Sequence, residues 1–151
     1  MMLVKEYMTS PAVTISAKMG IQEGLKMMHE GGFRRLPVVD EHGKLAGIVS
    51  ERDLLHASPS QATSLSIWEL NYLLSKVQIK EIMTKNVMVT RPDAALESAA
   101  GIMLDNKIGG LPVVDEHNKV IGIITESDIF KAFLGRHKSR SDMDVFMVKQ
   151  Q

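Results

Sequence analysis

The sequence contains no cysteine, no net charge and no long apolar run. The absence of cysteine excludes disulfides, thiolate catalysis and zinc–thiolate sites. Its 18 basic and 18 acidic residues cancel, so no basic footprint for nucleic acid is present. No segment is apolar over the length needed to span a bilayer, and no secretory signal opens the chain. A cytoplasmic protein that binds neither nucleic acid nor membrane is therefore expected.

What is present is the composition of an ordinary globular protein, with 44% hydrophobic and 24% charged residues. A chain of 151 residues forms one compact domain or two tightly dependent halves. Each half has only about 60 residues, which is marginal for an independent core. We therefore expect the halves to stabilise each other.

One stretch of sequence occurs twice, 75 residues apart and without a gap. A tandem repeat of this length indicates two copies of one supersecondary unit, packed with pseudo-twofold symmetry. Ligands tend to bind in the clefts between such units. The matched blocks are residues 4–9 and 79–84, 36–44 and 111–119, and 47–53 and 122–128.

Each copy predicts the element order β-α-β-β-α, a mixed α/β (α+β) fold class. A short extended segment, residues 12–15 or 87–90, comes first and is expected to pair in parallel with the next strand. A helix follows, with an apolar stripe at i, i+4 and i+7. The stripe residues are Ile21, Leu25 and Met28 in one copy and Leu96, Ala100 and Met103 in the other.

Two strands joined by a tight turn complete the apolar part of each copy. Gly43 and Asn118 stand where the turn needs a left-handed backbone. The return strands, 45–49 and 120–124, do not alternate in polarity and are expected to be buried on both faces.

The helix ends carry their own signals. Pro92 and Asp93 predict the start of the first helix in the second copy. The first helices are expected to end at Gly31–Gly32 and at Asn106–Lys107.

The predicted organisation is repeat 1 at 1–60, a connecting helix at 61–78, repeat 2 at 79–137 and a tail at 138–151. Ser66 and Glu69 form a capping-box signature for the connecting helix. Its apolar face predicts a helix that covers the core, in preference to one whose Trp68 and Tyr72 edge a binding groove. That face comprises Ile67, Leu70, Leu74 and Val77. The tail has a weak apolar patch at 145–148 and leaves a strand, a partner contact or disorder open.

A Ser/Thr-x-x-Asp motif follows the return strand in both copies, as Ser50 to Asp53 and Thr125 to Asp128. A helix start offers unpaired N–H groups to phosphate, and an aspartate can accept from both hydroxyls of a ribose. The same motif is also a capping box. Two observations favour a ligand role: both acids are Asp where a capping box prefers Glu or Gln, and both motifs follow a glycine and a buried strand.

The duplicated motifs resemble a tandem pair of CBS domains, the Bateman module, over residues 4 to 134. The resemblance is carried by Met8-Thr9 and Met83-Thr84, the two Leu-Pro-Val-Val-Asp runs and the two Gly-apolar-apolar-Ser/Thr-x-x-Asp motifs. The chain is also similar to the CBS portion of acetoin-utilisation-type proteins.

The resemblance implies a non-catalytic regulatory sensor for an adenosine-containing ligand: AMP, ADP, ATP or S-adenosylmethionine. It implies that Asp53 and Asp128 hold ribose, while Ser50 and Thr125 touch ribose or phosphate. The opposite repeat is then expected to supply the adenine pocket. The residues implicated are Thr9, Ala12 and Val13 for one site and Thr84, Val87 and Val89 for the other. The ligand is regulatory, and no cofactor is expected.

The two expected sites differ in charge. Arg34 and Arg35 precede the first Leu-Pro-Val-Val run, whereas Gly109 and Gly110 precede the second. Arginine has a fixed fork of donors that suits phosphate, although two solvated surface arginines are the alternative. The site with Ser50 and Asp53 is expected to prefer a phosphorylated ligand. The site with Thr125 and Asp128 lacks local positive charge, and is expected to bind a nucleoside-like ligand, to bind more weakly or to stay empty.

No catalytic constellation is found, so no enzyme activity is expected. There is no nucleophile elbow and no Walker motif, and His42 and His117 at the turns lack converging metal ligands. The leading hypothesis is a ligand-sensing homodimer that acts on a regulated partner protein. The alternative is an interaction or dimerisation scaffold in which both Ser/Thr-x-x-Asp motifs are only caps.

Overall fold

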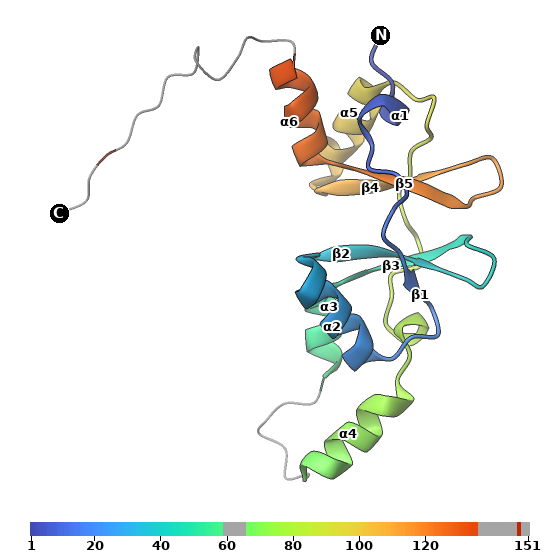
Figure 1. Cartoon of the computed structure of the whole chain (residues 1–151), viewed down its shortest axis with the longest axis vertical. Helices are drawn as coiled ribbons and strands as arrows, with labels where there is room; N and C mark the ends of the chain where they lie inside the picture. Colours follow the sequence, from blue (N-terminus) through green and yellow to red (C-terminus); the bar gives the residue numbers. More distant parts are fainter. Residues whose placement is uncertain (59–65, 136–147, 149–151) are drawn as a thin grey trace.

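The computed structural model describes residues 1–58, 66–135 and 148. Residues 61–65 of the predicted connecting helix lie outside them, and so does the predicted C-terminal tail apart from Val148. The fold is the expected mixed α+β arrangement, with two halves stacked along the long axis of the molecule (Figure 1). Each half is built around a β-hairpin, with helices packed on one of its faces.

The first half contains a three-stranded sheet in the order β1-β2-β3, covered by two helices. Strand β1 pairs in parallel with β2, and β2 pairs antiparallel with β3, which confirms the predicted strand directions. Its elements are β1 (Ile15–Ser16), α2 (Ile21–Gly31), β2 (Arg35–Val39), β3 (Leu45–Ser50) and α3 (Glu51–Ala57).

The second half repeats this plan in the same register. Its hairpin pairs β4 with β5 antiparallel, and the first strand is reduced to a parallel bridge between Thr90 and Val113. Its elements are α5 (Leu96–Asn106), β4 (Gly110–Val114), β5 (Val120–Thr125) and α6 (Glu126–Gly135). Helix α5 begins four residues after Pro92, so the predicted start is wrong. Pro92 and Asp93 bind the N-terminal segment instead: the Pro92 carbonyl accepts from the Lys5 amide at 2.9 Å, and the Asp93 carboxylate pairs with the Lys5 ammonium at 2.9 Å.

The turns and helix ends follow the local sequence signals. Gly43 and Asn118 have φ of 79° and 63°, and Gly32 and Lys107 end α2 and α5 with φ of 69° and 54°. All four lie in the left-handed region that glycine and asparagine adopt at least cost. In β3 and β5 no residue is exposed, but full burial alternates with partial burial.

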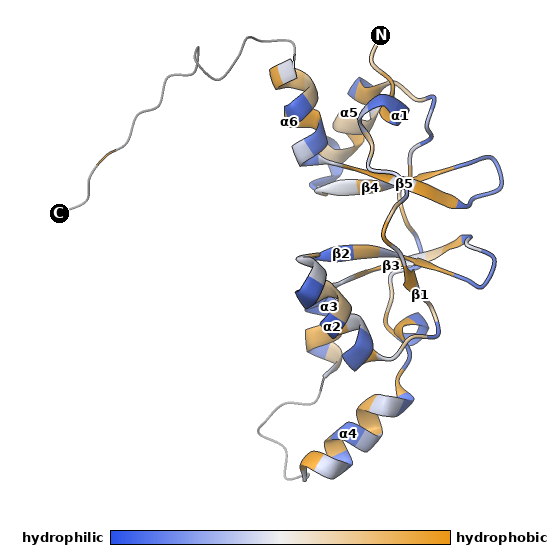
Figure 2. Cartoon of the chain, in the orientation of Figure 1, coloured by the Kyte–Doolittle hydropathy of each residue, from blue (hydrophilic) through white to orange (hydrophobic). Residues whose placement is uncertain are grey.

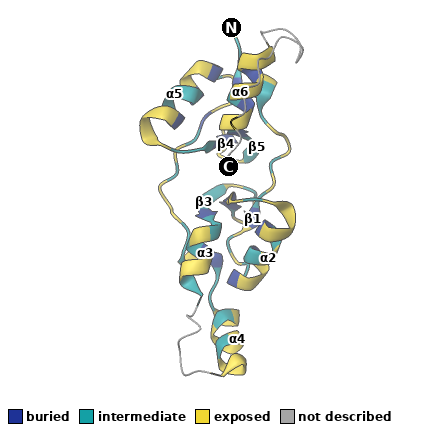
Figure 3. Ribbon diagram, turned by 90° about the vertical axis from the view of Figure 1, so that its left-hand side faces the viewer, coloured by how far each residue is buried: buried dark blue, intermediate teal, exposed yellow. Residues whose placement is uncertain are grey.

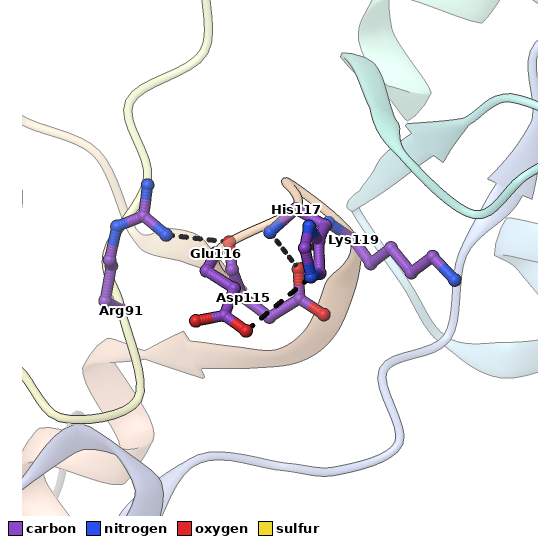
Figure 4. Close-up of polar contacts among 5 residues, drawn as sticks. All are labelled: Arg91, Asp115, Glu116, His117 and Lys119. Carbon is purple, nitrogen blue, oxygen red and sulfur yellow. Dashed lines mark hydrogen bonds and ion pairs between the residues drawn. The ribbon is translucent and has the colours of Figure 1, made fainter.

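An aspartate organises each hairpin turn, and Figure 4 shows the one in the second half. One Asp115 carboxylate oxygen accepts from the His117 amide at 2.8 Å and from the Lys119 amide at 3.0 Å, and Asp40 does the same with His42 and Lys44. The bond from the Lys119 amide is the main cause that holds the pKa of Asp115 below its ordinary value, as the Lys44 amide does for Asp40. These bonds favour the ionised carboxylate.

The N-terminal helix α1 (Val4–Tyr7) belongs to the core of the second half. Its Val4 is fully buried with Leu96, Met103 and Leu111, and Figure 1 shows α1 beside α5. Reciprocally, the short 3₁₀ helix η1 (Ile79–Glu81) buries Ile79 in the core of the first half, with Ile21, Met28 and others. Each repeat therefore completes the hydrophobic core of the other.

The connecting helix α4 (Ile67–Lys76) starts as predicted, because the Ser66 hydroxyl accepts from the Glu69 amide at 3.2 Å. The prediction that it covers the core is wrong. None of its residues is buried, and Trp68 is 81% exposed. Figures 1 and 3 show α4 at the far end of the first half, exposed along most of its length, and Figure 2 shows apolar residues on its surface.

Candidate functional site

Two crossing segments, residues 8–14 and 83–89, link each half to the core it completes. The Thr9 amide and carbonyl bond to Ile123 of β5 at 2.9 and 3.0 Å. Thr84 bonds in the same way to Ile48 of β3, at 2.9 Å in both directions. Each crossing segment therefore lies along the return strand of the opposite half, two residues before that half's Ser/Thr-x-x-Asp motif.

Glycine allows this close approach. A Cβ at Gly122 would lie 2.7 Å from the Met8 sulfur, and one at Gly47 would lie 2.7 Å from the Met83 sulfur and from the Thr84 carbonyl oxygen. Such distances are far below a normal contact, so the glycine in each return strand is a requirement of the crossing. The hairpins also bond to each other, from the Leu45 amide to the Asn118 carbonyl at 2.9 Å.

A cavity of about 870 Å³ lies between the halves. That volume is near the upper end of the range for small-molecule sites. It is lined where β2 and β4 begin and where β3 and β5 end. In Figure 1 these strand ends lie opposite the hairpin turns. Its lining residues from the predicted set are Thr9, Val13, Arg34, Arg35, Ser50 and Thr125.

The arginine pair is fixed at the beginning of β2. The Arg34 carbonyl accepts from the Glu51 amide at 2.8 Å, and the Gly109 carbonyl accepts from the equivalent Glu126 amide at 3.0 Å. Both links bring the start of one strand to the end of its partner. Thr125 lines the same cavity as Arg34 and Arg35, while the equivalent positions of its own repeat are Gly109 and Gly110.

The two aspartates make capping bonds. An Asp53 carboxylate oxygen accepts from the Ser50 amide at 3.0 Å, while the Ser50 hydroxyl accepts from the Asp53 amide at 3.0 Å. One Asp128 oxygen accepts both from the Thr125 amide at 2.9 Å and from the Thr125 hydroxyl at 3.0 Å. Asp128 is buried and Asp53 half-buried. Within the described chain, neither aspartate lines the cavity.

The remaining predicted residues are not part of the cavity lining. Ala12 is in the first crossing segment between the lining residues Thr9 and Val13. Thr84, Val87 and Val89 lie in the second crossing segment, whose residues do not contribute to this cavity in the described part of the chain. The first crossing segment therefore contributes Thr9 and Val13 to the cavity lining, whereas none of the predicted residues of the second crossing segment lines it.

Two lining residues, Leu55 and His56 of α3, lie outside every sequence motif. Arg52 is inside the Ser/Thr-x-x-Asp motif, and Gly109 and Gly110 stand out in the sequence only for their lack of charge. Only the folded arrangement brings them together. Over residues 1–58 and 66–135, no group of three or more metal-ligating side chains converges, and no helix has the length and apolarity to cross a bilayer.

Known proteins are similar to this chain in sequence and in fold. A family model of the CBS domain matches residues 4–60 and 79–135. A curated relative, an L-aspartate semialdehyde sulfurtransferase of Methanocaldococcus jannaschii, is 34% identical over 89% of this chain. The chain covers 24% of that relative, and about a quarter to a half of the length of the first curated relatives that it matches.

Solved structures agree. The CBS domain pair of protein MJ0100, in complex with 5-methylthioadenosine and S-adenosyl-L-methionine, is 34% identical with a TM-score of 0.70, covering 89% of this chain and 97% of that one. CBSX2 of Arabidopsis thaliana, in complex with AMP, is 31% identical with a TM-score of 0.75, over 91% and 100%. A putative acetoin utilization protein (AcuB) from Vibrio cholerae is 30% identical with a TM-score of 0.75, over 96% and 99%.

Proposed function

The chain belongs to the CBS-domain family, and on that premise we propose that it is a non-catalytic regulatory module that binds an adenosine-containing nucleotide between its repeats. The observation that carries the proposal is the 870 Å³ cavity, which both halves line. It combines apolar side chains such as Val13 and Ile123 with hydroxyl and guanidinium groups such as Ser50 and Arg35. That mixture suits a ligand with a flat apolar base and an anionic end. The similar MJ0100 pair and CBSX2, which hold adenosyl ligands, support it.

Regulation would follow from the shared cores. A ligand that contacts Thr9 in the first crossing segment and Ser50 in the first half bridges the two halves. It would therefore favour one relative orientation of the halves over others, and a partner protein could recognise that orientation. A cytoplasmic location is part of the proposal, based on the sequence.

Helix α6 of the second half suggests how two copies would associate. Phe130 and Leu134 lie four residues apart on one face of this helix and are 64% and 50% exposed. Clustered exposed apolar side chains mark interaction surfaces, so we expect a homodimer. Light scattering should give about twice the 16.7 kDa chain mass, and a monomer at working concentration would contradict this.

A scaffold without a small ligand is the second candidate. It is favoured by the bonds of Asp53 and Asp128, which are those of helix caps. On this account the cavity stays empty and the exposed helices carry the function. The same experiment separates the two candidates.

That experiment is a thermal-shift screen with AMP, ADP, ATP, S-adenosylmethionine and NAD, with and without Mg²⁺. At a hundredfold excess over Kd, a specific ligand should stabilise the fold by about 2.7 kcal/mol, which raises the Tm by roughly 5–10 °C in a chain of this size. A Val13→Trp variant should remove the shift by filling the cavity.

Met88→Trp is the matched control, because Met88 occupies the equivalent position of the second repeat and lies outside the cavity lining. It should keep the ligand-induced shift. No shift with any ligand would favour the scaffold. A shift that survives Val13→Trp would place the ligand elsewhere.

A further inference from the structure

The first repeat contributes more of the cavity lining than the second repeat does. It extends over one face of α3, where Arg52, Leu55 and His56 line it at the i, i+3 and i+4 positions of a helix surface. The equivalent positions on α6 are Ser127, Phe130 and Lys131. None of these three lines the cavity within the described residues. The cavity therefore extends along the second helix of the first repeat but not along the equivalent helix of the second repeat.

This extension concentrates positive charge in a chain whose net charge is zero. Arg34, Arg35 and Arg52 line the cavity, against the single carboxylate of Glu51. Among the described residues, the only close contacts between acidic and basic side chains are Lys5–Asp93, Glu41–His42 and Glu116–His117, so no described carboxylate pairs with these arginines. Guanidinium groups without an internal partner are suited to bind an anion with paired, charge-assisted hydrogen bonds.

Of the three hydroxyl side chains that line the cavity, the two in the Ser/Thr-x-x-Asp motifs also favour an anion on the side of the first repeat. The Thr125 hydroxyl donates its hydrogen to Asp128 at 3.0 Å, which leaves only its oxygen to accept. The Ser50 hydroxyl accepts from the Asp53 amide at 3.0 Å, and a hydroxyl has one hydrogen to donate as well. Phosphate oxygens need donors, and the free donors gather on the Ser50 side.

We propose that the Arg52 side of the cavity binds a polyphosphate chain, so that the site prefers a nucleoside triphosphate or diphosphate to a monophosphate. This inference rests on the proposed function. The nucleoside lies toward Thr9, Val13 and Ile123, and the first phosphate meets Arg34, Arg35 and Ser50. Further phosphates extend along α3 to Arg52, with His56 as an additional donor. A cationic ligand such as S-adenosylmethionine is disfavoured by the same charges.

The test is calorimetric titration of the full chain with AMP, ATP and inorganic triphosphate, without Mg²⁺. ATP should bind at least about tenfold more tightly than AMP, because each charge-assisted hydrogen bond is typically worth more than a factor of ten in affinity. Arg52→Ser introduces the residue that the second repeat has at this position. It should reduce ATP affinity about tenfold and AMP affinity much less. Lys131→Ala, on the equivalent face of α6, should change neither.

Equal affinities for AMP and ATP would overturn the inference, and so would an Arg52→Ser variant that weakens both ligands equally. If no adenine nucleotide binds but inorganic triphosphate does, with the same loss in Arg52→Ser, the proposed function fails and the polyphosphate site stands. If neither nucleotide nor triphosphate binds, both fail.

Discussion

Ile79→Ala is expected to destabilise the protein by roughly 2–5 kcal/mol, the range for removing a buried isoleucine side chain to alanine. Ile79 precedes every other element of the second repeat, yet its side chain is fully buried among core residues of the first half, including Ile15, Leu36 and Leu54. The loss leaves a cavity in a core that the first repeat cannot fill from its own sequence. Denaturant unfolding measures it as a lower midpoint.

Ile67→Ala is the control for Ile79→Ala. Ile67 lies on α4 and is 68% exposed, so its truncation should change the free energy of unfolding by less than about 0.5 kcal/mol. A cost below about 1 kcal/mol for Ile79→Ala would mean that η1 is not part of the first core. That result would contradict the packing in which each repeat completes the hydrophobic core of the other.

The second large effect is expected for Gly47→Ala. The new methyl carbon would lie 2.7 Å from both the Met83 sulfur and the Thr84 carbonyl oxygen. The methionine can move, but the carbonyl accepts a 2.9 Å bond from the Ile48 amide and cannot withdraw without breaking the crossing. Overpacking of this kind costs about 1–3 kcal/mol, again measured by denaturant unfolding.

Gly101→Ala provides a control of the same chemistry. Gly101 is inside α5, and a Cβ there would meet nothing within 4 Å. Alanine in a helix interior stabilises by about 0.5–1 kcal/mol over glycine. The two identical substitutions should therefore have opposite signs. If Gly47→Ala is neutral, the crossing segment does not approach β3 as closely as the structure has it.

The local parts of the fold could be predicted from sequence, because their causes are local. Gly43 and Asn118 take the left-handed conformation that their turns require, and Ser66 caps α4. The exchange of α1 and η1 could not be predicted. Because the two repeats have equivalent cores, the apolar residues Val4 and Ile79 fit either one, and no residue pattern records which core each segment joins.

The connecting helix shows a second limit of the pattern. Its apolar residues suggested burial against a core, yet Ile67 and Trp68 are 68% and 81% exposed. Hydrophobic periodicity identifies a helix and its apolar face but not whether that face has a partner within the same chain. The helix was predictable, and its position was not.

The candidate site was predictable in its motif residues only. Ser50, Thr125 and the arginine pair stand out because they are duplicated or conspicuously not duplicated. Leu55 and His56 do not, since they lie outside the motifs and only the folded structure shows that they face the cavity. The cavity is lined mainly by residues of the first repeat. The two repeats contribute unequally because their side chains differ at the strand ends.

The central claim is that an adenine nucleotide binds in the cavity between the repeats, and amide NMR titration with ATP tests it most directly. The largest chemical-shift changes are predicted at the lining residues, among them Thr9, Val13, Ser50, Gly110 and Thr125. The hairpin turns at His42 and His117 and the exposed helix α4 should change little. Saturable changes centred on those turns or on α4, or no changes at millimolar ATP, would contradict the account.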